Sequence, residues 1–164
     1  MGNGKETFAM YGFRIEIPRD WRVELNPKTN RQKGDVAFHS PRGNKFFISW
    51  GTLGEATKRF TSLQEHRDNS VKQIRGGRDV KDISVEGSHE ETLSGHTALF
   101  SHIKAEIRSG AFSRSTSDRG MSSVHLYCPE TSRYYIVYFL LGDPNEYPDF
   151  TKMFEETARS FVCH

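Results

Sequence analysis

The most apolar stretch of the chain is residues 134–141, where aromatic and branched side chains follow one another without a charged interruption. Eight residues are too few for a typical helix, and a run of this composition bounded by polar and turn-forming residues is typical of a strand. A strand that is apolar at both odd and even positions has no face for solvent. The run therefore predicts a central strand in a sheet that helices cover on both faces.

The remaining elements follow from the spacing of hydrophobic residues. Alternation predicts strands at residues 7–17 with a kink at Gly12, and at 21–25, 36–40, 45–50, 80–92, 96–108 and 124–128. In the strand at 80–92, Ile83 and Val85 are the expected inward positions. A helical period predicts helices at residues 55–75, ended by a left-handed stop at Gly76-Gly77, and at 150–161. Few hydrophobic residues occur in 109–122, which predicts a long mobile hairpin loop.

Charge and hydropathy exclude several classes of function. The 164 residues include 23 Lys and Arg and 21 Asp and Glu, so the formal net charge of +2 gives no overall attraction to nucleic acid or anionic membrane. No window reaches the roughly 18 apolar residues of a membrane-spanning helix, and the N-terminus lacks the apolar core of a signal peptide. We expect a single soluble cytoplasmic domain over residues 1–164, with no nucleic acid partner and no membrane insertion.

Residues 11–21, which read Tyr-Gly-Phe-Arg-Ile-Glu-Ile-Pro-Arg-Asp-Trp, resemble the opening strand and turn of the PsbP/Mog1 superfamily. The expected order of elements after Trp21 agrees as well. The resemblance implies an α+β fold, a three-layer α/β/α sandwich around a mainly antiparallel sheet. It also implies non-catalytic roles, as in an extrinsic photosystem II subunit, a nuclear-import factor that binds a small GTPase, and chaperone-like bacterial relatives.

We therefore predict a non-enzymatic protein-binding domain, acting as an adaptor, assembly factor or chaperone-like protein, with an unidentified protein partner and no cofactor. The exposed face of the helix at 55–75 is expected to be basic, and the hairpin at 41–44 and the loop at 109–122 carry further charges. Such groups suit recognition of a phosphate or an acidic peptide. The predicted partner-binding residues are Arg42, Arg59, Arg67, Arg114, Asp118 and Arg119.

Two other functions stay open. A small-ligand or lipid-binding domain would need a pocket between the sheet and a helix, lined by aromatic residues. The candidates for that lining are Phe47, Trp50, Phe100, Tyr135 and Phe139. An enzyme of unidentified class would need a cleft with convergent titratable groups. For a serine nucleophile, the candidates are Ser88, Ser94 and the serines around Arg114, and none of them lies in the strand-to-helix turn that exposes a nucleophile. For a cysteine nucleophile at Cys128, the nearby His125 is expected on the opposite face of the same strand.

Seven histidines and two cysteines are the potential metal ligands. His96 and His102 lie about 20 Å apart along one predicted strand, too far for one ion. His102 could meet His125 across neighbouring strands, with Glu106 or His164 as a third ligand. Because the sequence has no zinc-type spacing, we predict no metal site, and we expect Cys128 and Cys163 to be reduced.

Overall fold

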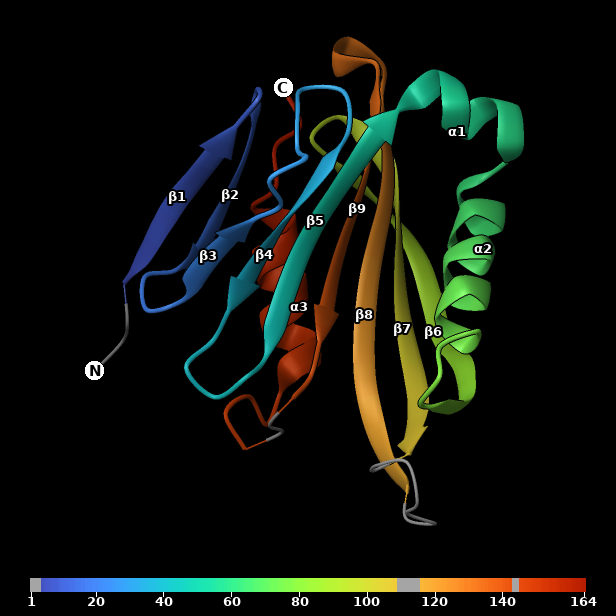
Figure 1. Ribbon diagram of the computed structural model, residues 1–164. Coiled ribbons are helices and arrows are strands. Elements are labelled where there is room, and N and C mark those ends of the chain that lie inside the picture. Colours follow the sequence, from blue (N-terminus) through green and yellow to red (C-terminus); the bar gives the residue numbers. More distant parts are fainter. Residues whose placement is uncertain (1–3, 109–115, 143–144) are drawn as a thin grey trace.

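The computed structural model describes residues 4–108, 116–142 and 145–164. In this part of the chain, seven strands form an antiparallel sheet with the order β3-β4-β5-β9-β8-β7-β6, and β1 and β2 form a separate hairpin (Figure 1). The strands are β1 Lys5–Met10, β2 Phe13–Pro18, β3 Arg22–Leu25, β4 Gly34–His39, β5 Lys45–Thr52, β6 Val80–Leu93, β7 His96–Arg108, β8 Thr116–Cys128 and β9 Arg133–Leu140. The helices are α1 Leu53–Arg59, α2 Leu63–Arg75, the short 3-10 turn η1 Pro129–Thr131, and α3 Phe150–Arg159.

The apolar run forms β9, the fourth of the seven strands, as predicted. Its Val137 pairs with Ile48 of β5 on one side and with Val124 of β8 on the other. Odd positions of β9 are buried, whereas the even positions are only half-buried. The two faces of the sheet are therefore covered to different degrees.

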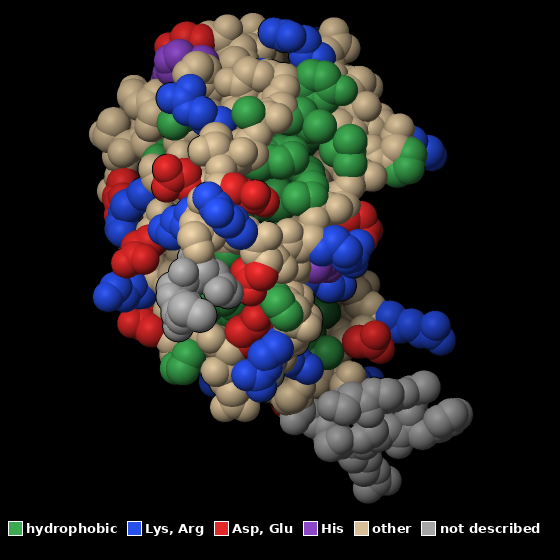
Figure 2. All heavy atoms as spheres, turned by 90° about the vertical axis from the view of Figure 1, so that its left-hand side faces the viewer, with side chains coloured by type: hydrophobic (Ala, Val, Ile, Leu, Met, Phe, Trp, Pro, Cys, Tyr) green, Lys and Arg blue, Asp and Glu red, His purple; other side chains and the backbone are tan. Residues whose placement is uncertain are grey.

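The first face of the sheet is covered by α3 and by the β1–β2 hairpin (Figure 1). Phe154 and Ala158 of α3 meet Phe13 and Ile15 of β2 in one large core. Helix α3 begins where Asp149 accepts a hydrogen bond from the Lys152 N–H at 3.4 Å, as the sequence predicted. Figure 2 shows the side of the molecule that bears the hairpin, with hydrophobic side chains grouped in its upper part and charges of both signs mixed below.

The second face is covered by α1 and α2. Helix α2 packs on β6, β7 and β8, and α1 contacts β5 and β9. Under α2 lies a smaller hydrophobic cluster that contains Val71, Ile83, Ile103, Ala105 and Met121. The predicted three-layer α/β/α sandwich is thus confirmed, with a thinner layer on the α1–α2 side.

Two predicted elements are in fact pairs of elements. The strand predicted at 7–17 is the β1–β2 hairpin, because Tyr11 (φ 48°) and Gly12 (φ 90°) both adopt left-handed conformations and form a tight turn. The helix predicted at 55–75 is interrupted at Phe60, which is extended. Helix α2 then starts afresh at Ser62, whose hydroxyl accepts from the Glu65 N–H at 3.1 Å.

Three local predictions are wrong. The loop predicted at 109–122 is a strand from Thr116 onward, because β8 pairs with β7 from Arg108↔Thr116 to Ala98↔Leu126; its first part, 109–115, lies outside the described residues. Val85 is 37% exposed, since a register shift follows it in β6. Gly76 ends α2 with a right-handed conformation, φ −70°, so no left-handed stop is needed there.

Candidate functional site

A groove runs along the second face of the sheet, beside α1 and α2. Three adjoining pockets form it, with volumes of about 430, 340 and 630 Å³. The first and second share Ser49 and Ile136, and the second and third share Met121 and Tyr138. We refer to them as the upper, central and lower pockets of the groove.

The floor of the groove is apolar and comes largely from the central strand. Ile136, Tyr138 and Leu140 are the half-buried even positions of β9, and Met121 of β8 adjoins them. The ring of Tyr138 stacks on Phe47 of the neighbouring strand, with ring centroids 4.6 Å apart. Helix α2 contacts β6, β7 and β8, and α1 contacts β5 and β9. The even positions of β9 stay only half-buried beneath them, so this floor is open.

The rim of the groove is basic. Six basic side chains line the three pockets, and Glu55 is the one acidic residue among the pocket-lining residues that the structure describes. The basic residues are Arg42, Lys45, Lys58, Arg59, Arg67 and Arg119. An apolar floor with a rim of one charge favours a ligand that combines hydrophobic and acidic groups.

The structure brings four of the six predicted binding residues to this one groove. Arg59 lines the upper pocket, Arg67 the central pocket, and Arg42 and Arg119 the lower pocket. Asp118 does not line it: its carboxylate pairs with Lys104 Nζ at 3.3 Å on the exposed surface of β7 and β8. Arg114 lies outside the described residues.

Arg67 does not lie on an exposed basic helix face, contrary to the sequence prediction. Its residue exposure is 8%, and Nη1 donates to the buried Ser101 Oγ at 3.0 Å. Nε donates to Asp68 Oδ1 at 2.8 Å, which balances the charge at the edge of the pocket. The other basic residues of α1 and α2, which are Lys58, Arg59, Lys72 and Arg75, are exposed. Arg75 also donates through Nη2 to the Ile83 carbonyl.

Two buried histidines lie beside Arg67. His66 Nδ1 is 3.1 Å from Tyr127 Oη, and His125 Nε2 is 3.2 Å from Ser70 Oγ. Burial, with the charge of Arg59 as a second cause, lowers the pKa of His66 to about 4. Burial, followed by the charges of His66 and Arg67, lowers the pKa of His125 to about 3. Both rings are therefore neutral at physiological pH.

The aromatic ligand pocket considered as an alternative from the sequence is not found among the described residues. Trp50, Phe100, Tyr135 and Phe139 are all buried in the large core on the α3 side. Phe47 lies on the other face of the sheet, against Tyr138. None of the three groove pockets is lined by these five side chains. For Trp50, Tyr135 and Phe139 the reason is that alternate residues of β5 and β9 point to opposite faces.

The histidine pair considered from the sequence is also separated. His102 hydrogen-bonds with Ser122 Oγ and with Glu155 of α3 on the first face, whereas His125 faces α2. Glu106 pairs instead with Lys81 at 3.6 Å. Burial, with a hydrogen bond to Cys128 as the next cause, raises the pKa of the Cys163 thiol to about 12, which disfavours it as a nucleophile.

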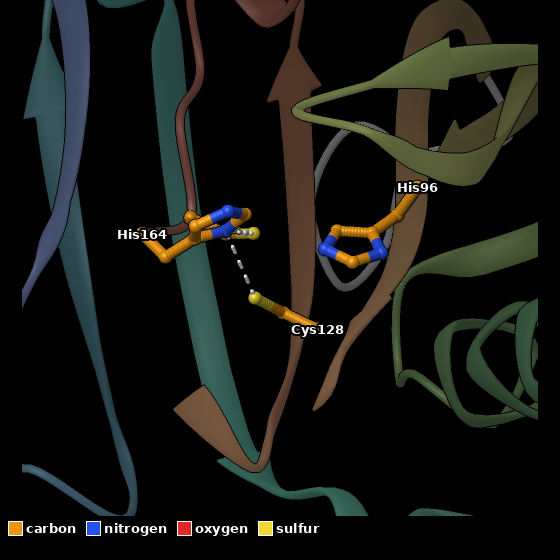
Figure 3. Close-up of side chains that lie close together, drawn as sticks. His96, Cys128 and His164 are labelled. Atoms are coloured by element: carbon orange, nitrogen blue, oxygen red, sulfur yellow. Dashed lines mark hydrogen bonds between the residues drawn. The ribbon is translucent and has the colours of Figure 1, made fainter. Parts of the chain in front are cut away.

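Two groups of side chains in the described part of the chain have ligand atoms within 4.8 Å of one another and could hold a metal ion. The first consists of His96, Cys128, Cys163 and His164 (Figure 3). The second consists of His89, His102 and Glu155. Neither follows a recognised spacing in the sequence, because the residues come from separate strands and from the segment after α3.

The open floor and the thiol cluster are the features that the sequence did not indicate. The even positions of β9 are half-buried because of the position of α2 over the sheet. The sequence of a uniformly apolar strand does not indicate this half-burial. The convergence of Cys128 with Cys163 depends on strand order. Cys128 ends β8, whereas Cys163 lies near the C-terminus, four residues after the end of α3.

The α/β/α fold of the chain is PsbP/Mog1-like, as its likeness to two solved structures shows. The solution structure of cyanobacterial PsbP (CyanoP) from Synechocystis matches with a TM-score of 0.73 and 9% identity, over 100% of this chain and 95% of that one. The crystal structure of the Saccharomyces cerevisiae Ran-binding protein Mog1p matches with a TM-score of 0.62 and 7% identity, over 99% and 96%. No family model and no curated protein matches the sequence. At these identities the likeness establishes the fold alone.

Proposed function

We propose that this domain is a non-enzymatic module that binds an acidic, partly hydrophobic segment of a cytoplasmic protein partner in the groove between α1–α2 and the sheet. The observation that carries the proposal is the composition of the groove. Its floor is apolar, and six basic residues against one acidic residue line its pockets. The described helices include none long and apolar enough to cross a membrane.

The groove suits an extended peptide better than a compact metabolite. Its three pockets adjoin one another along the sheet, and all of them are open to the surface. Tyr138 and Ile136 supply flat apolar area at its centre, and aromatic side chains in such positions commonly anchor partners. Arginines at the rim can pair with carboxylates in a bidentate manner.

The structural relatives are consistent with this proposal. Mog1p is described as a Ran-binding protein, so the same fold serves protein recognition in at least one case. The structural likeness to Mog1p does not identify the partner of this chain. For this chain, the basic rim and apolar floor are the grounds for a protein-binding function.

The test uses peptides selected from a random displayed library against the immobilised protein. We expect enrichment of peptides that combine Asp or Glu with aromatic or aliphatic residues, and an affinity that falls as salt is raised. The double variant Lys45→Glu with Arg59→Glu reverses two charges at opposite ends of the groove. We expect it to weaken binding at least tenfold.

The matched control is Arg22→Glu with Lys28→Glu. It makes the same charge change on exposed residues of β3 and the following loop, which line none of the groove pockets. Equal losses of affinity in the two double variants would mean that only net charge matters. Peptides without acidic residues would contradict the proposal directly.

A second candidate is the binding of a small polar ligand in the central pocket. Ser123 Oγ and His125 Nδ1 line this pocket and are buried without a hydrogen-bond partner among the described residues. Unsatisfied buried groups of this kind are uncommon unless a ligand or water meets them. A thermal-shift screen of small carboxylates and phosphates, with Ser123→Ala as the comparison, distinguishes this function from peptide binding.

A further inference from the structure

Four side chains from distant parts of the sequence converge at one end of the large core. His96 begins β7, Cys128 ends β8, and Cys163 and His164 follow α3. One ligand atom from each lies within 4.8 Å of the other three. In Figure 3 the rings of His96 and His164 stand on either side of Cys128, with dashed lines joining His164 to the sulfur atoms.

The two nitrogen-to-sulfur distances from His164 are close to those around a tetrahedral metal ion. With Zn–S of about 2.3 Å and Zn–N of about 2.0 Å, a sulfur and a nitrogen bound to one zinc ion lie roughly 3.6 Å apart. Nδ1 of His164 is 3.7 Å from Cys128 Sγ and 3.2 Å from Cys163 Sγ. Small side-chain movements would therefore complete the coordination.

The cluster is only partly satisfied without an ion. Each thiol has one further partner, since Cys128 Sγ donates to Glu130 Oε2 and Cys163 Sγ donates to Ser94 Oγ, both at 3.6 Å. Both thiols approach the same nitrogen of His164, which has one lone pair or one hydrogen to offer. Nε2 of His96 is buried and lies 2.7 Å from Glu130 Oε2, but the alignment is not that of a hydrogen bond. Buried polar atoms left in this state are rare in native proteins.

We propose that Cys128, Cys163, His96 and His164 bind one Zn²⁺ ion in a closed, structural site. Two thiolates and two imidazoles are a donor set that zinc favours and that calcium and magnesium do not. Binding displaces the two thiol protons into solvent, so no oxidant or reductant is required. Glu130 acts as a positioning residue, because its carboxylate lies against His96 and is 3.6 Å from Cys128 Sγ.

The ion would fasten the segment after α3 to the sheet. Among the described residues, that segment is held by the buried ring of Phe161 in the large core. It is also held by backbone hydrogen bonds between Arg14 and Val162, each 2.9 Å, and by the Cys163 N–H bonded to Ser94 Oγ at 3.1 Å. Zinc would add a link to both β7 and β8. Because the linked residues are far apart in sequence, the ion closes long loops of the chain.

The second group of side chains provides an internal comparison. His102 is already hydrogen-bonded through both ring nitrogens, to Ser122 and to Glu155. His89 Nε2 is 2.9 Å from Glu91, and its ring stacks on Phe100. These groups have partners without an ion, so His89→Ala is the matched control for the loss of a histidine.

The test is titration of the reduced, metal-free protein with Co²⁺, followed by Zn²⁺. We expect one Co²⁺ per chain, with a sulfur-to-cobalt charge-transfer band that Zn²⁺ abolishes. Cys163→Ser is expected to lose most of that band and at least tenfold in affinity. Because the His164 side chain is exposed, His164→Ala removes one ligand without disturbing the core, and we expect a similar loss of affinity.

Two further variants sharpen the result. His89→Ala is expected to bind Co²⁺ and Zn²⁺ as the wild type does. Glu130→Gln is expected to keep the band and the stoichiometry while the affinity falls roughly tenfold, as for residues that orient a ligand. A full loss of the band in Glu130→Gln would make it a ligand rather than a positioning residue and would overturn that assignment.

Three outcomes would overturn the site itself. The first is the absence of a charge-transfer band in the reduced wild-type protein. The second is equal affinity in the wild type and in His164→Ala. The third is a Cys128–Cys163 disulfide that forms in air despite saturating Zn²⁺, which would assign the two thiols to a redox pair instead.

Discussion

Nη1 of Arg67 donates to Ser101 Oγ at 3.0 Å, which ties α2 to β7 at the wall of the central pocket. Ser101 is fully buried, and Arg67 is 8% exposed. The pair thus places a cation at the edge of an apolar floor, with Asp68 on its outer side. The hydrogen bond therefore links α2 to the sheet beside the floor of the groove.

Replacing Arg67 with Ala should destabilise the fold and widen the central pocket. The buried Ser101 hydroxyl would lose its charged donor, at a cost of about 1–3 kcal/mol in the free energy of unfolding. The double variant Arg67→Met with Ser101→Ala removes both polar groups and should cost less. Urea denaturation at neutral pH measures both. A larger loss in the double variant would show that the hydrogen bond is not the main contribution of Arg67.

The two buried histidines should make stability depend on pH. The pKa is about 4 for His66 and about 3 for His125 in the folded protein, against 6.5 for an exposed histidine. Because the folded values are lower, the unfolded chain binds more protons below pH 6.5, and stability falls as pH decreases from there toward 4. The expected slope is up to about 1.4 kcal/mol per pH unit for each histidine.

Denaturation between pH 7 and 5 tests this dependence, because it stays above the range in which most carboxylates titrate. His125→Gln should reduce the slope by about half over that range. A slope that persists in the double variant His66→Gln with His125→Gln would locate the effect elsewhere.

Much of the architecture could be predicted from hydrophobic spacing. The central position of β9 follows from a strand with no polar face, and α3 follows from Phe154 and Ala158 at helical spacing with Asp149 before them. The β1–β2 turn could not be predicted, because Tyr11 is an unusual residue for a left-handed turn position. The first residues of β8 were predicted as a loop because they are polar. They lie where the sheet extends beyond the hydrophobic side chains that cover it.

The site could be predicted only in part. Charged residues at 42, 59 and 119 were identified as binding candidates from local composition, and the fold brings them to one groove. Their common location depends on strand order, which no local pattern encodes. The same holds for Cys128 and Cys163, which lie 35 residues apart in the sequence and meet because β8 ends beside the segment that follows α3.

Zinc should raise the thermal stability of the domain. A ligand at 100 times its dissociation constant stabilises the folded state by about 2.7 kcal/mol if it does not bind the unfolded chain. For a chain of 164 residues, this corresponds to an increase in Tm of roughly 5–10 °C. Differential scanning calorimetry with and without Zn²⁺ measures the shift. Cys163→Ser should show none, and a shift of equal size in that variant would dissociate stabilisation from the proposed site.

Two glycine-to-alanine changes near the upper pocket should have opposite effects. A Cβ at Gly51 would lie 2.6 Å from the ring and hydroxyl of Tyr134, which lines that pocket. Gly51→Ala should therefore displace Tyr134 and cost about 1–3 kcal/mol. A Cβ at Gly54, in α1, meets nothing within 4 Å, so Gly54→Ala should stabilise the helix by up to about 1 kcal/mol. Chemical denaturation of the two variants checks both signs, and peptide binding should weaken in Gly51→Ala alone because the displaced ring enters the groove.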